Sequence, residues 1–204
     1  MSRSALAPLV LASASPRRRE LLDQIGVRYQ DAPVAIDESP GEEEAPDLYV
    51  LRMARQKALT CQQGWHEPGR VFLGADTTVV VDGQILGKPV DAEQARAMLA
   101  RLSGREHQVM SGVALAGPSA VRERVVTSRV RLRPLSSAEI DNYVATGEPL
   151  DKAGAFGVQS RGAALVAEVI GSYTAVVGLP LEAVTDLLYQ VDQPVHQWWV
   201  AMDE

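Results

Sequence analysis

Short apolar runs typical of strands alternate along this chain with segments of helical period, and this alternation limits the folds open to it. Apolar runs occur at residues 9–12, 71–73 and 79–81, whereas apolar residues recur at helical spacing within 21–25 and 48–58. Strands that alternate with helices and some hairpins are typical of a mixed α/β protein. We therefore expect a central, twisted mixed sheet flanked by helices.

The first unit is predicted to be a strand, a turn and a helix. Residues 9–12 form the strand, and the helix follows the polar segment 13–15. Ser15 suits the N-cap position, Pro16 is tolerated at the first helical position and Gly26 provides a C-terminal stop. The acidic, proline-broken residues 37–47 predict a loop. A second helix should follow it and end near Gly64, with an apolar face made of Leu48, Leu51, Ala54 and Ala58.

A β-hairpin is the clearest local feature of the sequence. Val79-Val80-Val81 and Gln84-Ile85-Leu86 flank Asp82-Gly83, a dipeptide that favours a two-residue hairpin turn. The remaining elements are expected to be a helix capped by Asp91 that ends at Gly104, strands at 107–115 and 122–132, a helix from the capping box Ser136–Glu139 to Gly147, a glycine-rich β-like stretch at 153–177 and a last helix from Leu179 to Leu188.

Length and composition exclude several classes of protein. The chain has 204 residues, 46% hydrophobic and 23% charged, which suits one globular domain over residues 1–204. Its 26 acidic residues outnumber its 20 basic residues, which argues against a nucleic-acid-binding protein, because a phosphate backbone needs a basic face. No run approaches the roughly 20 apolar residues of a membrane span, no secretory signal is visible and the lone Cys61 cannot form an internal disulfide. We expect a cytoplasmic protein.

The first candidate site lies where the first predicted strand meets the first predicted helix. A helix N-terminus carries unpaired N–H groups and a partial positive charge, and Arg17 and Arg18 add bidentate donors there. Together with Ser13 they suit a phosphate chain. A capped helix with surface arginines explains the same residues, and spacing alone leaves both interpretations open.

Carboxylates form the second candidate site. Asp76 follows an apolar strand, where open α/β sheets place their ligands, and it is a candidate metal ligand or general base. The alternative is an aspartate that stabilises a turn. Asp37 and Glu38 begin the acidic loop, where a solvated run of charge is the simpler interpretation.

Lysines are unusually rare in this chain. Lys57, Lys88 and Lys152 are its only three, against 17 arginines, and each is a candidate for binding phosphate oxygens as a point charge or for an ordinary surface role. The histidines His66, His107 and His196 are too far apart to match a zinc motif. Neither a P-loop nor a GxGxxG motif is present.

Six ordered blocks of residues together resemble one known family. They are residues 11–22, Gly74-Ala75-Asp76-Thr77, Gly87-Lys88-Pro89, residues 102–107, residues 147–154 and the pair Gly171-Ser172-Tyr173 with Gly178-Leu179-Pro180. The pattern is similar to that of the Maf family of nucleoside triphosphate pyrophosphatases and covers about residues 9–188. The tail 189–204 lies outside the resemblance and is apolar enough to pack on the body or at a subunit contact.

The resemblance implies an elongated two-lobed α/β fold with a deep cleft, a homodimer and hydrolysis between the α and β phosphates of a nucleoside triphosphate. It implies a divalent cation, Mg²⁺, Mn²⁺ or Co²⁺, held by Glu38 and Asp76, with Asp76 as the proton acceptor. Ser13, Arg18, Lys57 and Lys88 match phosphate-binding positions. The family has also been associated with inhibition of septum formation, so a nucleotide-binding regulator of cell division is the alternative function.

Base preference in the family depends on positions that match Arg17, Thr77 and Gln159. The glutamine resembles the dTTP/UTP branch, whereas a glutamate there is similar to the 7-methyl-GTP branch. An amide can both donate to O4 and accept from N3–H of uracil or thymine, whereas a carboxylate only accepts. Ser160, Arg161 and Ser111 depart from the usual pattern, in which a glycine, a small or apolar residue and a threonine are common.

Overall fold

A seven-stranded mixed sheet forms the centre of the protein, as expected. The computed structural model describes residues 8–199, and its strands follow the order β2-β1-β3-β5-β6-β7, with β4 paired to β3. β1 pairs in parallel with β2 and β3, and the other pairs are antiparallel. The strands are β1 (Leu9–Leu11), β2 (Tyr29–Asp31), β3 (Phe72–Val81), β4 (Gln84–Leu86), β5 (Glu106–Ala116), β6 (Val121–Leu132) and β7 (Val166–Ile170).

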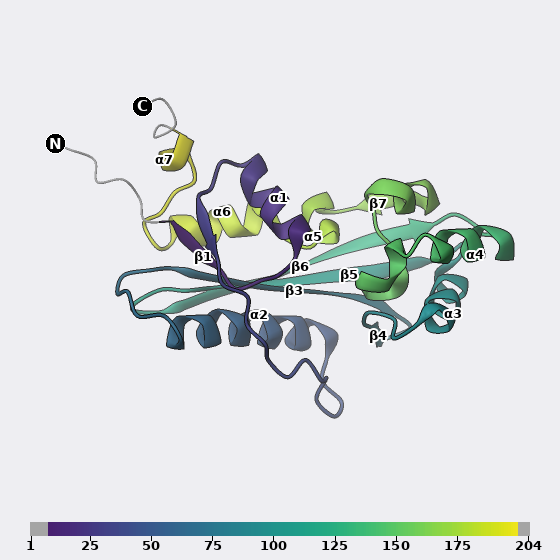
Figure 1. Cartoon of the computed structure of the whole chain (residues 1–204), viewed down its shortest axis with the longest axis horizontal. Helices are drawn as coiled ribbons and strands as arrows, with labels where there is room; N and C mark the ends of the chain where they lie inside the picture. Colours follow the sequence, from purple (N-terminus) through teal and green to yellow (C-terminus); the bar gives the residue numbers. More distant parts are fainter. Residues whose placement is uncertain (1–7, 200–204) are drawn as a thin grey trace.

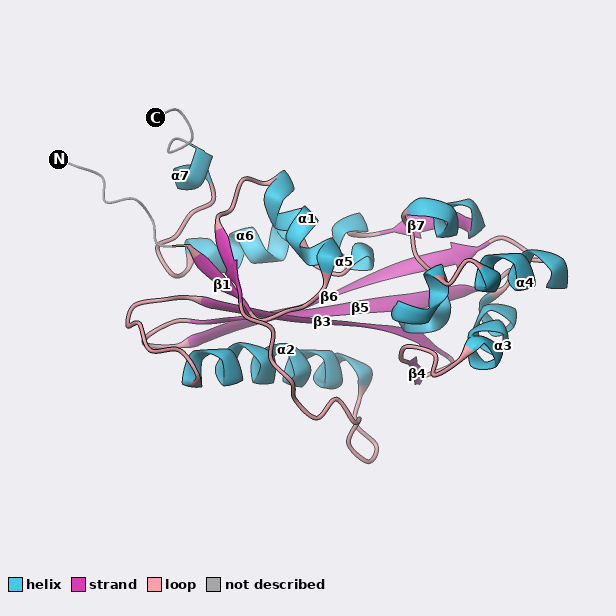
Figure 2. Ribbon diagram, in the orientation of Figure 1, coloured by secondary structure: helices cyan, strands magenta, loops and turns pink. Residues whose placement is uncertain are grey.

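Helices cover both faces of the sheet (Figure 1). The long helix α2 lies alone along one face, whereas α1, α5 and α6 lie on the opposite face near β1, and α3, α4 and the 3₁₀ helices gather at the far end of β3 and β5 (Figure 2). The helices are α1 (Pro16–Gln24), α2 (Pro46–Gln63), α3 (Ala92–Leu102), α4 (Ser137–Ala145), η1 (Glu148–Asp151), η2 (Ala153–Ala155), η3 (Ser160–Leu165), α5 (Tyr173–Val177), α6 (Leu181–Tyr189) and α7 (His196–Trp199).

Two glycines let α2 approach the sheet closely. A Cβ at Gly74 of β3 would overlap the Ala54 carbonyl oxygen, and one at Gly112 of β5 would overlap the carbonyl oxygen of Val50. A side chain at either position would therefore push the helix away. This close approach brings the side chains of α2 against the middle of β3.

Local signals in the sequence fix several element ends. The turn at Asp82-Gly83 has φ angles of 53° and 75°, as a type I′ hairpin requires. Asp91 accepts a hydrogen bond from the Gln94 N–H at 2.8 Å, and Ser136 forms the expected capping box with Glu139. These predictions from short-range chemistry are confirmed.

Ser15 occupies the N-cap of α1 as expected, although its side chain makes no capping hydrogen bond. Two other expectations are wrong in detail. Leu48 is 57% exposed, because α2 turns a face that includes Tyr49 and Lys57 to the sheet instead. Within residues 153–177 only β7 is a strand: left-handed backbone at Gly154, Ala155 and Ser160 interrupts the extended chain where η2 and η3 form, and residues 173–177 form α5, which begins at its N-cap Ser172.

The tail after α6 packs on the body of the protein, and it adds α7 beyond the helix expected to be last. Trp198 is fully buried and Val195 is 4% exposed, while the Trp199 indole N–H donates to the Ile25 carbonyl at 2.6 Å. Residues 200–204 lie outside the described part of the chain. Up to Trp199, the apolar tail residues are therefore explained by their packing against the rest of the same chain.

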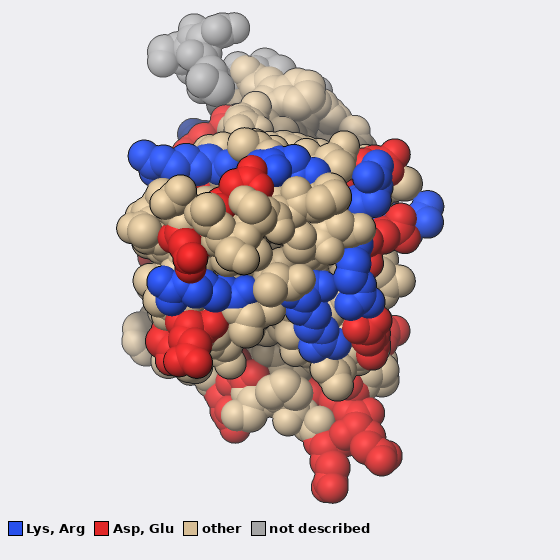
Figure 3. All heavy atoms as spheres, turned by 90° about the vertical axis from the view of Figure 1, so that its right-hand side faces the viewer, with Lys and Arg blue, Asp and Glu red and all other residues tan. Residues whose placement is uncertain are grey.

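Surface charge is mixed where α4 and β7 end the molecule. Figure 3 shows basic and acidic side chains interleaved there. Arg96 pairs with Asp141, Arg105 with Asp82 and Arg131 with Glu168, at N···O distances of 2.6, 2.6 and 3.2 Å. This end therefore presents paired charges rather than a continuous basic surface.

Candidate active site

A cleft of about 660 Å³ opens along an uncovered edge of β3. β1 pairs with β3 only at Phe72 and Leu73, and β4 pairs with it only from Val79, so residues 74–78 lack a strand neighbour on that side within the described sheet. Asp76 therefore lies in the middle of a long strand. The expectation that it follows the end of a strand is wrong, because the chain continues extended through 74–78 to reach the hairpin.

Strand alternation divides the cleft into two sides. Asp76 points toward α2, where it meets Lys57, whereas Thr77 points to the opposite face, where it meets Ser111 and the carbonyl of Gly178. The side near Thr77 has apolar walls made of Val79, Val109, Phe156, Val158, Val176 and Val177. The cleft therefore has one charged side and one largely apolar side.

Lys57 joins two carboxylates on the charged side. Its Nζ lies 2.7 Å from Oδ1 of Asp76 and 2.7 Å from Oε1 of Glu38. Lys57 is only 8% exposed, because α2 lies close to the sheet. Burial alone would raise the pKa of Glu38, but the cations Lys57, Lys88 and Arg18 outweigh it and hold that pKa below its ordinary value. Glu38 therefore belongs to the site and is not part of a merely solvated acidic run.

Two side chains of α2 fasten the loop that carries Glu38. The Tyr49 hydroxyl donates to the backbone carbonyl of Glu38 at 2.9 Å. Arg52 makes two 2.6 Å hydrogen bonds to the Glu44 carboxylate and a third, at 3.0 Å, to the Ser39 carbonyl. Burial, with the nearby charge of Asp76, raises the pKa of Tyr49 to about 12, so this hydroxyl stays protonated and keeps donating.

The start of α1 forms the next part of the cleft wall. Arg18 donates from Nε to the Gly178 carbonyl and from Nη1 to Oγ of Ser13, both at 2.9 Å. Oγ of Ser13 also accepts the Ser15 N–H at 3.2 Å. Burial lowers the pKa of Arg18, although the carboxylate of Asp76 opposes this effect. The first turn of α1 contains no acidic side chain and no side-chain cap, so its N–H groups are available to an anion.

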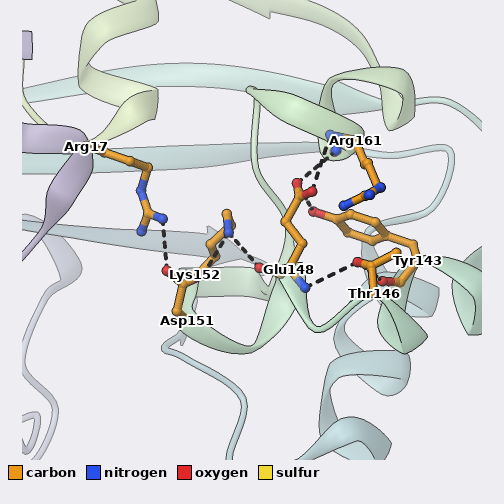
Figure 4. Close-up of polar contacts among 8 residues, drawn as sticks. Arg17, Tyr143, Thr146, Glu148, Asp151, Lys152 and Arg161 are labelled. Carbon is orange, nitrogen blue, oxygen red and sulfur yellow. Dashed lines mark hydrogen bonds and ion pairs between the residues drawn. The ribbon is translucent and has the colours of Figure 1, made fainter. Parts of the chain in front are cut away.

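An ion pair crosses the cleft between α1 and η1. Arg17 Nη1 lies 3.0 Å from the Asp151 carboxylate, and Lys152 Nζ lies 2.7 Å from the same group (Figure 4). Lys152 also donates to the Glu148 carbonyl at 2.6 Å. Lys152 is thus largely engaged within its own segment, whereas Lys88, which also lines the cleft, is exposed.

Glu148 organises the segment that carries Gln159. Its carboxylate accepts the Tyr143 hydroxyl at 3.0 Å and the backbone N–H groups of Gly162 and Arg161 at 3.0 and 3.3 Å (Figure 4). These N–H groups begin η3, for which Gln159 is the N-cap residue. A Cβ at Gly162 would overlap the Gly157 carbonyl oxygen. Gln159 is therefore presented to the cleft by a closely packed, hydrogen-bonded turn.

The structure brings nine of the candidate residues and also Lys152 to one cleft, whereas Asp37, the neighbour of Glu38, does not line it. The nine are Ser13, Arg17, Arg18, Glu38, Lys57, Asp76, Thr77, Lys88 and Gln159. The residue patterns did not single out Tyr49, Thr78 or Glu148 as parts of this site, and they marked Ser111 only as a departure from the family pattern. Tyr49 lies eight residues before Lys57 and shares its helix face, a signal that helical spacing contains. The contact of Ser111 with Thr77 depends on strand register, which no local pattern reveals.

Oxygen ligands on the charged side fit a divalent cation bound together with substrate phosphates. Asp76 and Glu38 supply two carboxylates, and Thr78, on the same face of β3 as Asp76, has a buried Oγ1 without a hydrogen-bond partner. Mg²⁺ is commonly held by one or two carboxylates plus phosphates and water. Across residues 8–199 no cluster of three or more His, Cys, Asp or Glu side chains forms a complete protein cage.

Comparison with known proteins agrees with this architecture. The family model described as "Maf-like protein" matches residues 8–191. A dTTP/UTP pyrophosphatase from Alcanivorax borkumensis is 53% identical over 93% of this chain and 98% of its own length. Proteins of the same name from Myxococcus xanthus and Anaeromyxobacter are 52% and 50% identical over 92% of this chain, and cover 94% and 91% of their own lengths. The chain belongs to the Maf family.

Proposed function

We propose that this protein is a nucleoside triphosphate pyrophosphatase that hydrolyses dTTP and UTP to the monophosphate and pyrophosphate. The observation that carries the proposal is the pair of carboxylates, Asp76 and Glu38, joined by buried Lys57 in the same cleft as the uncapped start of α1. Relatives about 50% identical over nearly the whole chain bear the name dTTP/UTP pyrophosphatase. Both lines of support point to hydrolysis of a phosphoanhydride.

The phosphate chain binds between the start of α1 and the lysines. The free N–H groups of α1 and the buried guanidinium of Arg18 meet the anionic oxygens, and Ser13 holds that guanidinium in place. Lys88 supplies a positive charge from the exposed wall, and Thr78, whose buried Oγ1 has no hydrogen-bond partner among the described residues, lies on the same side of the cleft. These groups also stabilise the charge that develops on the leaving pyrophosphate.

Asp76 accepts the proton of the attacking water. Lys57 holds one carboxylate oxygen, Oδ1, at 2.7 Å and so orients Asp76, whose second oxygen remains available to a water molecule. Glu38 and Asp76 are the residues that would hold Mg²⁺, Mn²⁺ or Co²⁺. When bound, such a cation supplies neutralisation of phosphate charge and lowers the pKa of bound water.

The nucleobase lies on the apolar side. Flat aromatic rings fit walls made of valines and Phe156, and the few polar groups there fix orientation. We assign base selection to Arg17, Thr77 and Gln159, with the Gln159 amide donating to a pyrimidine carbonyl. Arg17 lies within reach of the base or the phosphates once it leaves Asp151.

We extend the proposal to the domain organisation and the oligomeric state, which we take from the resemblance to the family. Residues 1–204 form one domain, and two copies form a homodimer in the cytoplasm. No helix within residues 8–199 is long and apolar enough to cross a membrane. Light scattering of the purified chain tests the dimer, which predicts twice the 22.0 kDa mass of one chain.

Product analysis tests the activity. UTP, dTTP, CTP and GTP are incubated with Mg²⁺, Mn²⁺ or Co²⁺, and pyrophosphate and orthophosphate are measured separately. Release of pyrophosphate is expected, whereas release of orthophosphate would indicate attack at the γ phosphate. Binding without any turnover would favour the regulatory alternative.

The Asp76→Asn variant then tests the mechanism. The amide keeps the shape of the side chain but cannot accept the proton, and loss of a general base commonly costs about 10²- to 10⁴-fold in kcat. Asp37→Asn is the matched control, because Asp37 is exposed and bonds only the Ser39 N–H among the described contacts. Activity of Asp76→Asn within tenfold of the unmodified enzyme would contradict the role of Asp76.

A further inference from the structure

Three oxygens form a hydrogen-bonded chain behind the apolar side of the cleft. Oγ1 of Thr77 lies 2.7 Å from Oγ of Ser111, and Oγ of Ser111 lies 2.7 Å from the backbone carbonyl oxygen of Ala175. Thr77 and Ser111 are directly opposite each other on β3 and β5. Ser111 is completely buried, whereas Thr77 lines the cleft.

The carbonyl at the end of this chain fixes the direction of every proton in it. A carbonyl oxygen only accepts, so the single hydroxyl proton of Ser111 is donated to Ala175. Ser111 must then accept at its short contact with Thr77, which makes Thr77 the donor. The second neighbour of the Thr77 hydroxyl, the Gly178 carbonyl at 3.4 Å, is also only an acceptor. The Thr77 proton therefore stays inside the protein.

Thr77 consequently offers only lone pairs to the cleft. A ligand group that contacts Oγ1 of Thr77 must be a hydrogen-bond donor, because a second acceptor would leave two lone pairs facing each other in an apolar environment. The imide N3–H is the only N–H on the base edge of uracil and thymine. Cytosine has nearly the same shape but carries a lone pair at N3.

We propose that Ser111 is a positioning residue that holds the Thr77 hydroxyl as an acceptor and thereby selects imide bases, uracil and thymine, over cytosine. This inference rests on the proposed function, since it assumes that a pyrimidine occupies the apolar side. Ser111 acts through Thr77 and does not touch the substrate. Thr77, on the wall of the cleft, makes the contact with the base.

The surroundings of Ser111 suit this task. Its neighbour Gly112 lies against the backbone of α2, which fixes β5, and Ala175 belongs to α5, whose N-cap Ser172 accepts the Ala175 N–H at 3.2 Å. The backbone around Ser111 and the backbone around Ala175 are thus both fixed in position. A threonine at position 111 can make the same two hydrogen bonds, whereas an alanine can make neither.

A substrate experiment on the unmodified enzyme tests the inference first. Values of kcat/KM are measured for UTP, CTP, 5-methyl-UTP and 3-methyl-UTP, the last of which lacks the N3–H. UTP and 5-methyl-UTP should be used similarly, and CTP and 3-methyl-UTP should be about ten- to a hundredfold poorer substrates. Equal use of UTP and CTP would overturn the inference while leaving the pyrophosphatase function intact.

Variants at position 111 then test the positioning role. Ser111→Ala removes the short acceptor at 2.7 Å and leaves the Thr77 hydroxyl only the long 3.4 Å contact with the Gly178 carbonyl, so its proton can turn toward an acceptor on the base and the preference for UTP over CTP should fall about tenfold, mainly through KM. Ser111→Thr, the matched control, should keep the preference. A Ser111→Ala enzyme with unchanged preference, or a Ser111→Thr enzyme that loses it, would refute the role of the hydroxyl.

Calorimetric binding of UMP and CMP separates the two proposals. Tighter binding of UMP by the unmodified protein, lost in Ser111→Ala, supports the inference even if no triphosphate is hydrolysed. If pyrophosphate is released but UMP and CMP bind equally, the inference fails and the proposed function stands. If the Ser111→Ala protein folds poorly, equal binding of UMP and CMP by the unmodified protein still refutes the inference.

Discussion

Lowering the pH from 7 to 5 should destabilise this protein through one buried histidine. His107 is 3% exposed, and its ring packs edge-on against Phe156 with centroids 5.0 Å apart. Neither ring nitrogen has a hydrogen-bond partner in the described structure. Burial lowers the pKa of His107 from 6.5 to about 4, and a weak contribution from the Arg105 backbone offsets only part of this effect.

The sign and size of the effect follow from proton binding. Between pH 6.5 and 4 the unfolded chain binds a proton at this histidine and the folded chain does not, so the free energy of unfolding falls as the pH falls. The difference between 6.5 and about 4 corresponds to roughly 3 kcal/mol at 1.36 kcal/mol per pKa unit, of which about 2 kcal/mol is lost by pH 5. Above pH 6.5 both states are neutral and the contribution vanishes.

Urea unfolding at pH 7, 6 and 5 measures this loss. The stabilising carboxylates Glu44 and Glu139, whose pKa values arginine hydrogen bonds lower to about 2, lose their effect only below their ordinary value of 4.5, so they do not contribute in this range. His107→Leu should remove the decline between pH 7 and 5. Replacing exposed His66 by asparagine is the control and should leave it unchanged. An equally steep decline in His107→Leu would refute the reasoning.

Gly112→Ala should destabilise the fold by about 3 kcal/mol or more in urea unfolding, because its Cβ would overlap the Val50 carbonyl, whereas Gly117→Ala, whose nearest contact would be 3.5 Å, should cost less than about 1 kcal/mol. Ser160→Gly should raise the free energy of unfolding by about 0.5–1 kcal/mol, since serine there has a φ of 53°; an unchanged or lower melting temperature would contradict this. Gln159→Glu should lower kcat/KM for UTP and dTTP about ten- to a hundredfold relative to GTP, and an unchanged ranking of substrates would remove Gln159 from the base site. Arg18→Ala should reduce kcat/KM similarly for every nucleotide, because phosphates are common to all; a loss confined to one base would contradict a role at the phosphates.

The sequence by itself determined the elements whose signals are local. The Asp82-Gly83 hairpin, the caps at Asp91 and Ser136 and the stop at Gly26 depend on residues within a few positions of one another, so their chemistry is complete in the linear chain. The mixed α/β class follows from the periods of the apolar residues. The family follows from six blocks whose order and spacing no single element supplies.

Only the tertiary structure decided how the site is assembled. Lys57 reaches Asp76 because Gly74 and Gly112 let α2 lie directly on β3 and β5, and those close contacts join segments far apart in the sequence. The buried face of α2 includes Lys57, so the spacing of apolar residues alone wrongly predicts that Leu48 lies on that face. The 3₁₀ segment that follows Gln159 depends on hydrogen bonds from the backbone N–H groups of Arg161 and Gly162 to the carboxylate of Glu148, a contact between residues 13 and 14 positions apart that no local propensity encodes.

The same distinction applies to the chemistry. From residue types alone, Asp76 could equally stabilise a turn and Glu38 could equally belong to a solvated acidic run. A carboxylate in a sequence carries no information about which residues will be its neighbours in space. Strand register and packing bring the carboxylates of Asp76 and Glu38 to the ammonium group of Lys57. They also fix the direction in which the hydroxyl protons are donated, from Thr77 to Ser111 and from Ser111 to the Ala175 carbonyl. Electrostatic and hydrogen-bond functions act over a few ångströms, and it is the fold that brings distant residues within that range.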